Sequence, residues 1–79
     1  MEYYVKSVVP MIESNYDNFT MVEKTIADFF IQNRRKMDFS AKSISEKLDV
    51  SEASLSRFAK KCGYRGYREF LYQYEENLV

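Results

Sequence analysis

Residues 40–62 restrict the fold of this chain most strongly, because they have the pattern of two short helices joined by a tight turn. Ser40 and Ser51 can each cap a helix, since a serine hydroxyl accepts a hydrogen bond from an unpaired N–H of the first turn. Asp49 stands where the chain must turn sharply, and aspartate adopts a left-handed conformation more easily than most residues other than glycine. The sequence therefore predicts a helix-turn-helix motif over about 40–62.

The apolar residues of this motif have helical spacing. Ile44 and Leu48 lie four residues apart on the first helix, and Val50 would pack under the turn. The second helix carries apolar residues at i, i+3, i+4 and i+7, namely Leu55, Phe58, Ala59 and Cys62. We expect these side chains to form the contact between the two helices and the rest of the domain.

The opposite face of the second helix is small, polar and cationic. At about 100° per residue, Ala53, Arg57 and Lys60 point away from the apolar stripe. A recognition helix needs such a face, because its N-terminal residues approach base edges and its basic residues meet phosphates. An ordinary solvated helix face in a protein that binds no DNA is the alternative interpretation.

The distribution of charge supports the DNA interpretation better than the total charge does. The formal net charge of the 79 residues is zero. Residues 51–68 nevertheless carry five cations against Glu52 alone, a net of +4, whereas residues 1–39 carry −1 and residues 69–79 carry −3. A local basic patch sets the attraction to phosphate, so the second helix and the turn after it are the expected contact region.

Several function classes find no support in the residues. The chain has one cysteine and no histidine, so an internal disulfide is impossible, and Cys62 is most simply a buried core residue. No metal-ligand spacing and no glycine-rich phosphate loop appear, so we expect no metal, no cofactor and no enzymatic activity. No apolar run approaches the ~20 residues of a membrane span, and no signal-peptide pattern opens the chain, so we expect a cytoplasmic protein.

The rest of the chain predicts an all-α domain over residues 1–79, since two glycines and one proline leave little room for hairpins. An apolar stripe predicts a helix over residues 2–14, which Pro10 would either kink or restart, and we expect a single helix with a disturbed C-terminal turn. Ser14 to Phe19 should form a loop. Thr20 and Glu23 form a capping box for a helix ending near Gln32, whose core face would hold Val22, Ile26, Phe29 and Phe30.

A last helix should follow the motif. Gly63 is a natural residue to end the recognition helix. The stripe after it has spacings i, i+3, i+4, i+7 and i+11, and consists of Tyr67, Phe70, Leu71, Tyr74 and Leu78. Its tyrosines could stack on bases, but their helical spacing favours core packing. The cations of the linker over 33–38, which are Arg34, Arg35 and Lys36, either touch phosphate or belong to a solvated loop.

Three segments together resemble a known family. Residues 23–33 (EKTIADFFIQN), 50–58 (VSEASLSRF) and 63–70 (GYRGYREF) are similar to the N-terminal domain of RpiR-type bacterial transcription regulators, and the resemblance covers roughly residues 5–78. The resemblance implies a small five-helix, homeodomain-like bundle that binds operator DNA as a dimer. Asp49 stands where the family usually has Gly, and Ser45 where it usually has Ala.

The resemblance also implies a wider biological setting. In the family, a C-terminal sugar-isomerase-like domain senses a phosphorylated sugar, so a phosphosugar effector would bind outside these 79 residues. Genes of sugar or phosphosugar metabolism would then be the regulated targets. Because the last apolar stripe stops in mid-pattern at Val79, we expect the chain to be a fragment of a longer regulator.

By position, seven residues correspond to the family's recognition helix: Ser51, Glu52, Ala53, Ser54, Ser56, Arg57 and Lys60. Ser51 and the N-terminal amides can hold a phosphate. Ser54, Ser56 and Arg57 are the candidates for reading bases, with guanine the best partner for Arg57, unless Arg57 forms a structural ion pair. The candidate phosphate contacts are Lys60, Lys61, Arg65, Lys42 and Ser43.

The sequence thus predicts specific binding to double-stranded operator DNA, with a recognition helix over about 52–62 in the major groove. The alternative is a helical module for protein–protein interaction or dimerisation that binds no DNA.

Overall fold

The computed structural model describes residues 8–77, and these form five α-helices and one 3-10 turn. The elements are α1 (Val8–Ser14), η1 (Tyr16–Asn18), α2 (Met21–Gln32), α3 (Ala41–Leu48), α4 (Glu52–Lys61) and α5 (Tyr67–Glu76). No strand occurs among the described residues, and the expected all-α, five-helix architecture is confirmed. The part of the first predicted helix before Val8, and Leu78 of the last stripe, lie outside the described residues.

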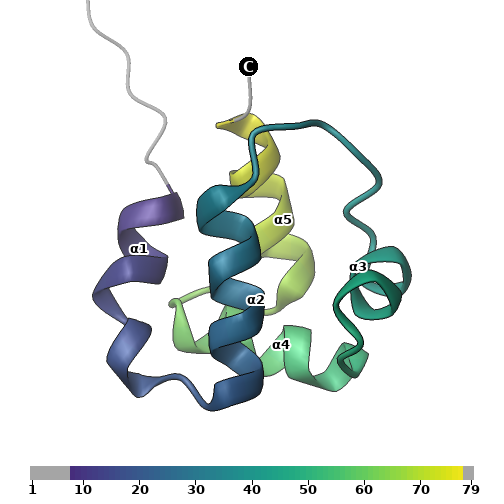
Figure 1. Cartoon of the computed structure of the whole chain (residues 1–79). Helices are drawn as coiled ribbons and strands as arrows, with labels where there is room; N and C mark the ends of the chain where they lie inside the picture. The colour runs from purple at the N-terminus through teal and green to yellow at the C-terminus, as the bar shows by residue number, and fades with distance from the viewer. Residues whose placement is uncertain (1–7, 78–79) are drawn as a thin grey trace, which may run out of the picture.

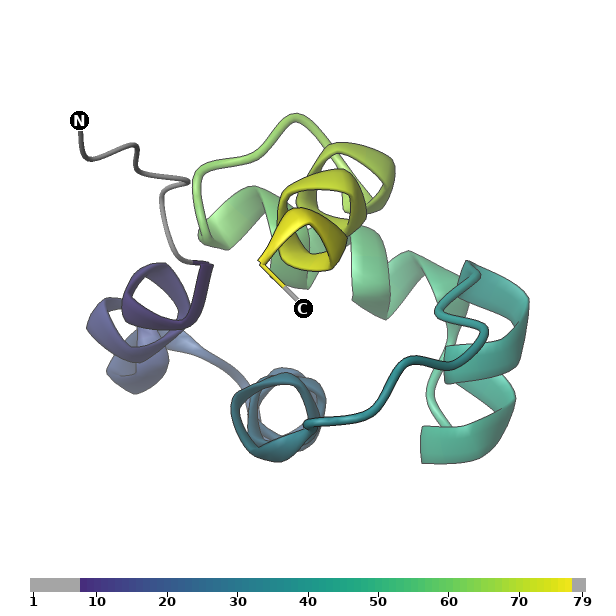
Figure 2. The same cartoon turned by 90° about the horizontal axis from the view of Figure 1, so that it is seen from above.

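Helices α1, α2 and α5 stand side by side, and α4 crosses beneath them at one end of the molecule (Figure 1). Helix α3 lies on the side away from α1 and packs against α4, as the view from above also shows (Figure 2). The described chain begins and ends at the opposite end of the molecule from α4. Helix α4 is therefore held by α2, α3 and α5 while its outer side is left uncovered by other helices.

An aromatic cluster around Phe30 fills the space between α2, α4 and α5. The Phe30 ring centroid lies 4.9 Å from that of Phe70 and 4.8 Å from that of Tyr74, and the Phe58 ring stacks 6.1 Å away. All four of these residues are buried. Tyr67 is buried too, and its hydroxyl donates to the Phe39 carbonyl oxygen at 2.7 Å. Core packing rather than base stacking is thus confirmed for Tyr67 and Tyr74.

The buried face of α2 differs from the predicted one at two positions, since Phe29 is only partly buried and packs against the core. Val22 was expected in the core, but it is 44% exposed, and the buried residues are Glu23, Ile26, Ala27 and Phe30. The cause is the predicted capping box, in which the Thr20 N–H donates to Glu23 Oε1 at 2.9 Å and the Glu23 N–H donates to Thr20 Oγ1 at 3.2 Å. This cap fixes the first turn with Glu23 pointing inward.

Two further predictions concern Pro10 in α1 and the loop that follows this helix. Pro10 lies within α1, and whether the helix is disturbed before it depends on residues outside the described range. The predicted loop from Ser14 to Phe19 contains the short turn η1.

None of the helices between residues 8 and 77 combines the length and apolar character needed to cross a membrane.

The turn between α3 and α4 has the predicted left-handed residue. Asp49 has φ 58° and ψ 49°, and the Val50 N–H donates to the Ser45 carbonyl oxygen at 3.0 Å. Helix α4 ends in the same way, since Gly63 has φ 100° and the Tyr64 N–H donates to the Ala59 carbonyl oxygen at 3.1 Å. Asp49 is the one non-glycine residue with positive φ among those described.

We expect Asp49→Gly to stabilise the domain by about 0.5–1 kcal/mol, because glycine adopts the left-handed conformation without the strain of a Cβ, minus its larger entropy loss on folding. Thermal melting of the purified protein measures this as a rise of about 2–8 °C. The matched control is Glu46→Gly, in the interior of α3, which should lower the melting temperature by a similar amount. A lower melting temperature for Asp49→Gly would contradict the prediction.

Candidate nucleic-acid interface

Helix α4 begins at a capped N-terminus. The Ser54 N–H donates to Ser51 Oγ at 3.1 Å, which is the cap predicted for Ser51. The helix runs from Glu52 to Lys61, and Cys62 is its last flanking residue, so the predicted range of about 52–62 is met within one residue. The first-turn N–H groups that the cap leaves unpaired carry the positive end of the helix dipole toward solvent.

The two faces of α4 separate as expected. Leu55, Phe58, Ala59 and Cys62 are completely buried. Ala53, Arg57 and Lys60 are exposed, together with Ser51 and Glu52 at the N-terminus. The core therefore presents, rather than covers, the small and cationic face of the helix.

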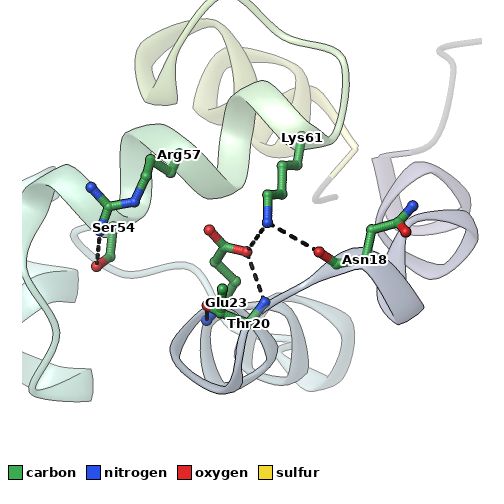
Figure 3. A network of polar contacts seen from close by, with 6 residues as sticks. All are labelled: Asn18, Thr20, Glu23, Ser54, Arg57 and Lys61. Atoms are coloured by element: carbon green, nitrogen blue, oxygen red, sulfur yellow. Dashed lines mark hydrogen bonds and ion pairs between the residues drawn. The ribbon is translucent and has the colours of Figure 1, made fainter.

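Arg57 is free of acidic partners within the described chain. Its Nη2 donates to Ser54 Oγ at 3.2 Å, and no ion pair to Arg57 occurs among residues 8–77 (Figure 3). The structural ion pair that was the alternative role for this residue is thus absent from the described part of the chain. Its charge remains available to a ligand.

Ser54, which was predicted to read bases, is buried. Only 6% of it is exposed. Its hydroxyl is 2.9 Å from Ser51 Oγ and accepts from Arg57. Its hydroxyl is thus engaged by neighbouring side chains within the domain.

Lys61, which was predicted to contact phosphate, forms an ion pair within the domain. Its ammonium donates to Glu23 Oε1 at 2.7 Å and to the Asn18 carbonyl oxygen at 3.0 Å (Figure 3). Burial alone raises the pKa of Glu23, but the hydrogen bonds from Lys61 and Thr20 outweigh it, and the net effect lowers that pKa. The ion pair therefore ties the C-terminal turn of α4 to the first turn of α2.

The remaining candidate DNA contacts differ in their exposure and in their hydrogen bonds within the domain. Lys42 and Arg65 are exposed. Ser56 is half-buried and lines a groove with the N-terminal residues of α3 and α5. The Ser43 hydroxyl donates to Asp38 Oδ2 at 2.7 Å, so its proton is already engaged by a carboxylate of the domain.

The linker cations lie away from α4. Arg34 donates to the carbonyl oxygens of Ile31 and Asn33 at the end of α2, which is the end opposite α4 in Figure 1. The solvated-loop interpretation of residues 33–38 is the one that this position favours.

Three residues that shape the interface were missed by sequence reasoning. Glu23 was recognised only as a cap, and no local pattern reveals its ion pair with Lys61, 38 residues away. Tyr67 was placed in the core without its bond to the linker. Asp38 accepts from the Ser40 N–H and from Ser43, and these bonds lower its pKa. The signal for Asp38 was present, because aspartate often bonds to the backbone two residues on.

The thiol of Cys62 and the acidic residues bear on possible redox and metal chemistry. Cys62 is completely buried as predicted, and burial followed by the charge of Glu23 raises the pKa of its thiol to about 12. The thiol is therefore protonated at neutral pH. Among the residues that the structure describes, no group of three His, Cys, Asp or Glu could hold a metal ion.

Comparison with known proteins identifies relatives along nearly the whole chain. The sequence model of the family described as "Helix-turn-helix domain, rpiR family" matches residues 6–78. An uncharacterized HTH-type transcriptional regulator of Thermotoga maritima is 38% identical over 65 residues, which is 80% of this chain and 23% of the relative. The HTH-type transcriptional regulator HexR of Pseudomonas aeruginosa is 28% identical over 76 residues, 95% of this chain and 27% of the relative. The chain thus spans about a quarter of the length of these curated relatives.

Proposed function

Because this chain belongs to the rpiR family of helix-turn-helix domains, we propose that it binds double-stranded operator DNA with α4 in the major groove. The observation that carries the proposal is the exposed face of Ala53, Arg57 and Lys60 on a helix whose opposite face is completely buried. A helix held in this way can enter a groove without unpacking the domain.

The charges of this face suggest a division of work. Ser51 and the free amides of the first turn of α4 bind one phosphate. Arg57 reads a guanine through two parallel hydrogen bonds, and Lys60, Lys42 and Arg65 neutralise neighbouring phosphates. Small Ala53 allows the N-terminal end of the helix to approach the base edges closely.

Arg57→Ala and Lys60→Ala should separate base reading from phosphate binding. Duplexes are first selected from a random pool by the wild-type protein, and the affinities of both variants are then measured at several salt concentrations. Arg57→Ala should lower discrimination at one base pair by about 1–3 kcal/mol, roughly 5- to 150-fold. Lys60→Ala should weaken binding to all duplexes and flatten the slope of log affinity against log salt by about one unit.

Glu46→Ala provides the control, because Glu46 is exposed on α3 and has no role in the proposed contact. If Arg57→Ala and Lys60→Ala both bind every duplex as the wild type does, the proposed face is wrong. Salt-insensitive binding by the wild type would favour a protein-interaction module instead.

The wider proposals rest on family membership and lie beyond the described residues. We propose that the domain acts as a homodimer within a longer regulator of sugar or phosphosugar metabolism genes. A phosphosugar effector would bind in the part of the relatives' length that this chain does not span. No catalytic role is proposed for these 79 residues.

A further inference from the structure

We infer that Ser54 is a positioning residue for sequence reading: its buried hydroxyl holds the Arg57 guanidinium at the N-terminal end of α4, where base edges are read. The inference rests on the proposed function and refines it. It starts from the hydrogen-bonded chain of Ser51, Ser54 and Arg57, in which successive heavy atoms lie 2.9 and 3.2 Å apart.

The direction of these hydrogen bonds follows from their chemistry. A guanidinium has donors only, so Arg57 must donate to Ser54 Oγ. If the Ser51 hydroxyl also donated to Ser54, the Ser54 proton would be buried without an acceptor among the residues described. Ser54 therefore donates to Ser51, which leaves the proton of the exposed Ser51 hydroxyl directed outward.

The consequence for Arg57 is its position along the helix. Arg57 lies one turn after Ser54, yet its charged end is carried back toward the first turn of α4 (Figure 3). Helical side chains lean toward the N-terminus, and the hydrogen bond to Ser54 selects the conformers that do so most fully. One of the five guanidinium N–H donors is used, and four remain for a base and a phosphate.

The hydrogen bond to Ser54 also restricts the conformations of the Arg57 side chain, some of which would lower sequence specificity. An unrestrained arginine on this face can turn to either neighbouring phosphate, a contact that carries no sequence information. Holding the side chain before binding lowers the entropy that must be lost on forming the base contact. Ser54 thus acts on base discrimination through Arg57, although it does not touch DNA itself.

Ser54→Ala tests the inference, because alanine removes the hydroxyl but keeps the Ser51 cap on the backbone N–H and favours a helix. Discrimination at the base pair read by Arg57 should fall about 2- to 10-fold. Affinity for duplexes of unrelated sequence, the salt slope and the melting temperature should stay close to those of the wild type. In an Arg57→Ala background, Ser54→Ala should have no further effect on discrimination.

The control is Ser45→Ala, which removes a serine hydroxyl from α3. In the wild type this hydroxyl donates to the Lys42 carbonyl oxygen. A second measurement needs no DNA: the ¹⁵N–¹H signals of the Arg57 guanidinium should show hindered rotation in the wild type and free rotation in Ser54→Ala. The inference is overturned if Ser54→Ala discriminates as the wild type does, or if its effect persists without Arg57. If Arg57→Ala loses discrimination while Ser54→Ala keeps it, the proposed function stands and only the role of Ser54 fails.

Discussion

Phe30→Ala should destabilise the domain by about 3–5 kcal/mol, since it removes a completely buried ring from the middle of the core and leaves a cavity. The ring contacts Phe58 of α4 and both Phe70 and Tyr74 of α5. A domain of this size has a total stability of only about 4–12 kcal/mol. Equilibrium urea unfolding should therefore show a strongly reduced midpoint, with part of the protein unfolded in buffer.

Phe29→Ala is the matched control, because Phe29 is the neighbouring ring on the same helix and is only partly buried. It should cost roughly half as much as Phe30→Ala or less. Equal losses for the two variants would contradict the assignment of Phe30 as the centre of the core. Loss of DNA binding in Phe30→Ala would follow from unfolding alone and would carry no information about the interface.

Lys61→Ala should cost about 2–3 kcal/mol of stability, because it leaves the carboxylate of Glu23 buried with the Thr20 N–H as its remaining donor. The value lies below that of a fully buried ion pair, since 39% of the Lys61 side chain is exposed. Thermal melting at neutral pH measures the loss. Lys60→Ala changes the adjacent, exposed lysine and should alter stability by less than about 0.5 kcal/mol.

The pH dependence provides an independent check on this pair. The pKa of Glu23 in the folded protein lies below its usual 4.5, so its contribution is present above that pH and is lost as the pH falls through the folded-state pKa. Without Lys61, a hydrogen bond and a charge that lower the pKa of Glu23 are both lost, so that pKa rises and this contribution becomes smaller. The stability difference between wild type and Lys61→Ala should therefore shrink as the pH falls from 7 toward about 4.

If Lys61→Ala instead has the melting temperature of the wild type and only flattens the slope of log affinity for DNA against log salt, Lys61 is the phosphate contact that the sequence alone suggested. The two roles make opposite predictions for stability and for the salt slope, so a single variant decides between them.

Most of the fold follows from local patterns that the sequence displays directly. The caps at Thr20, Ser40 and Ser51 and the left-handed residues Asp49 and Gly63 lie where they were predicted. Each of these features depends on neighbours within about five residues, and such features can be derived without knowing how the helices pack.

The candidate site was predictable in its outline but less so in its details. The exposed side of α4 follows from the spacing of Leu55 and Phe58, whereas the burial of Ser54 and the ion pair of Lys61 with Glu23 of α2 do not. Helical spacing alone does not show which flank a distant helix will occupy. Val22 is a different case, because the local capping box turns Glu23 inward, and only the ion pair with a lysine 38 residues further along the chain was out of reach of local patterns.

Chemical-shift mapping of the ¹⁵N-labelled protein during titration with a selected duplex tests the central proposal most directly. The account predicts that the largest changes fall on the backbone amides of Ser51, Ala53, Arg57 and Lys60, with smaller changes at Lys42 and Arg65. The chemical shifts of the backbone amide of Tyr72, on the exposed side of α5, should not change. Changes centred on α1 and α5 with α4 unaffected would contradict the proposal that α4 enters the groove.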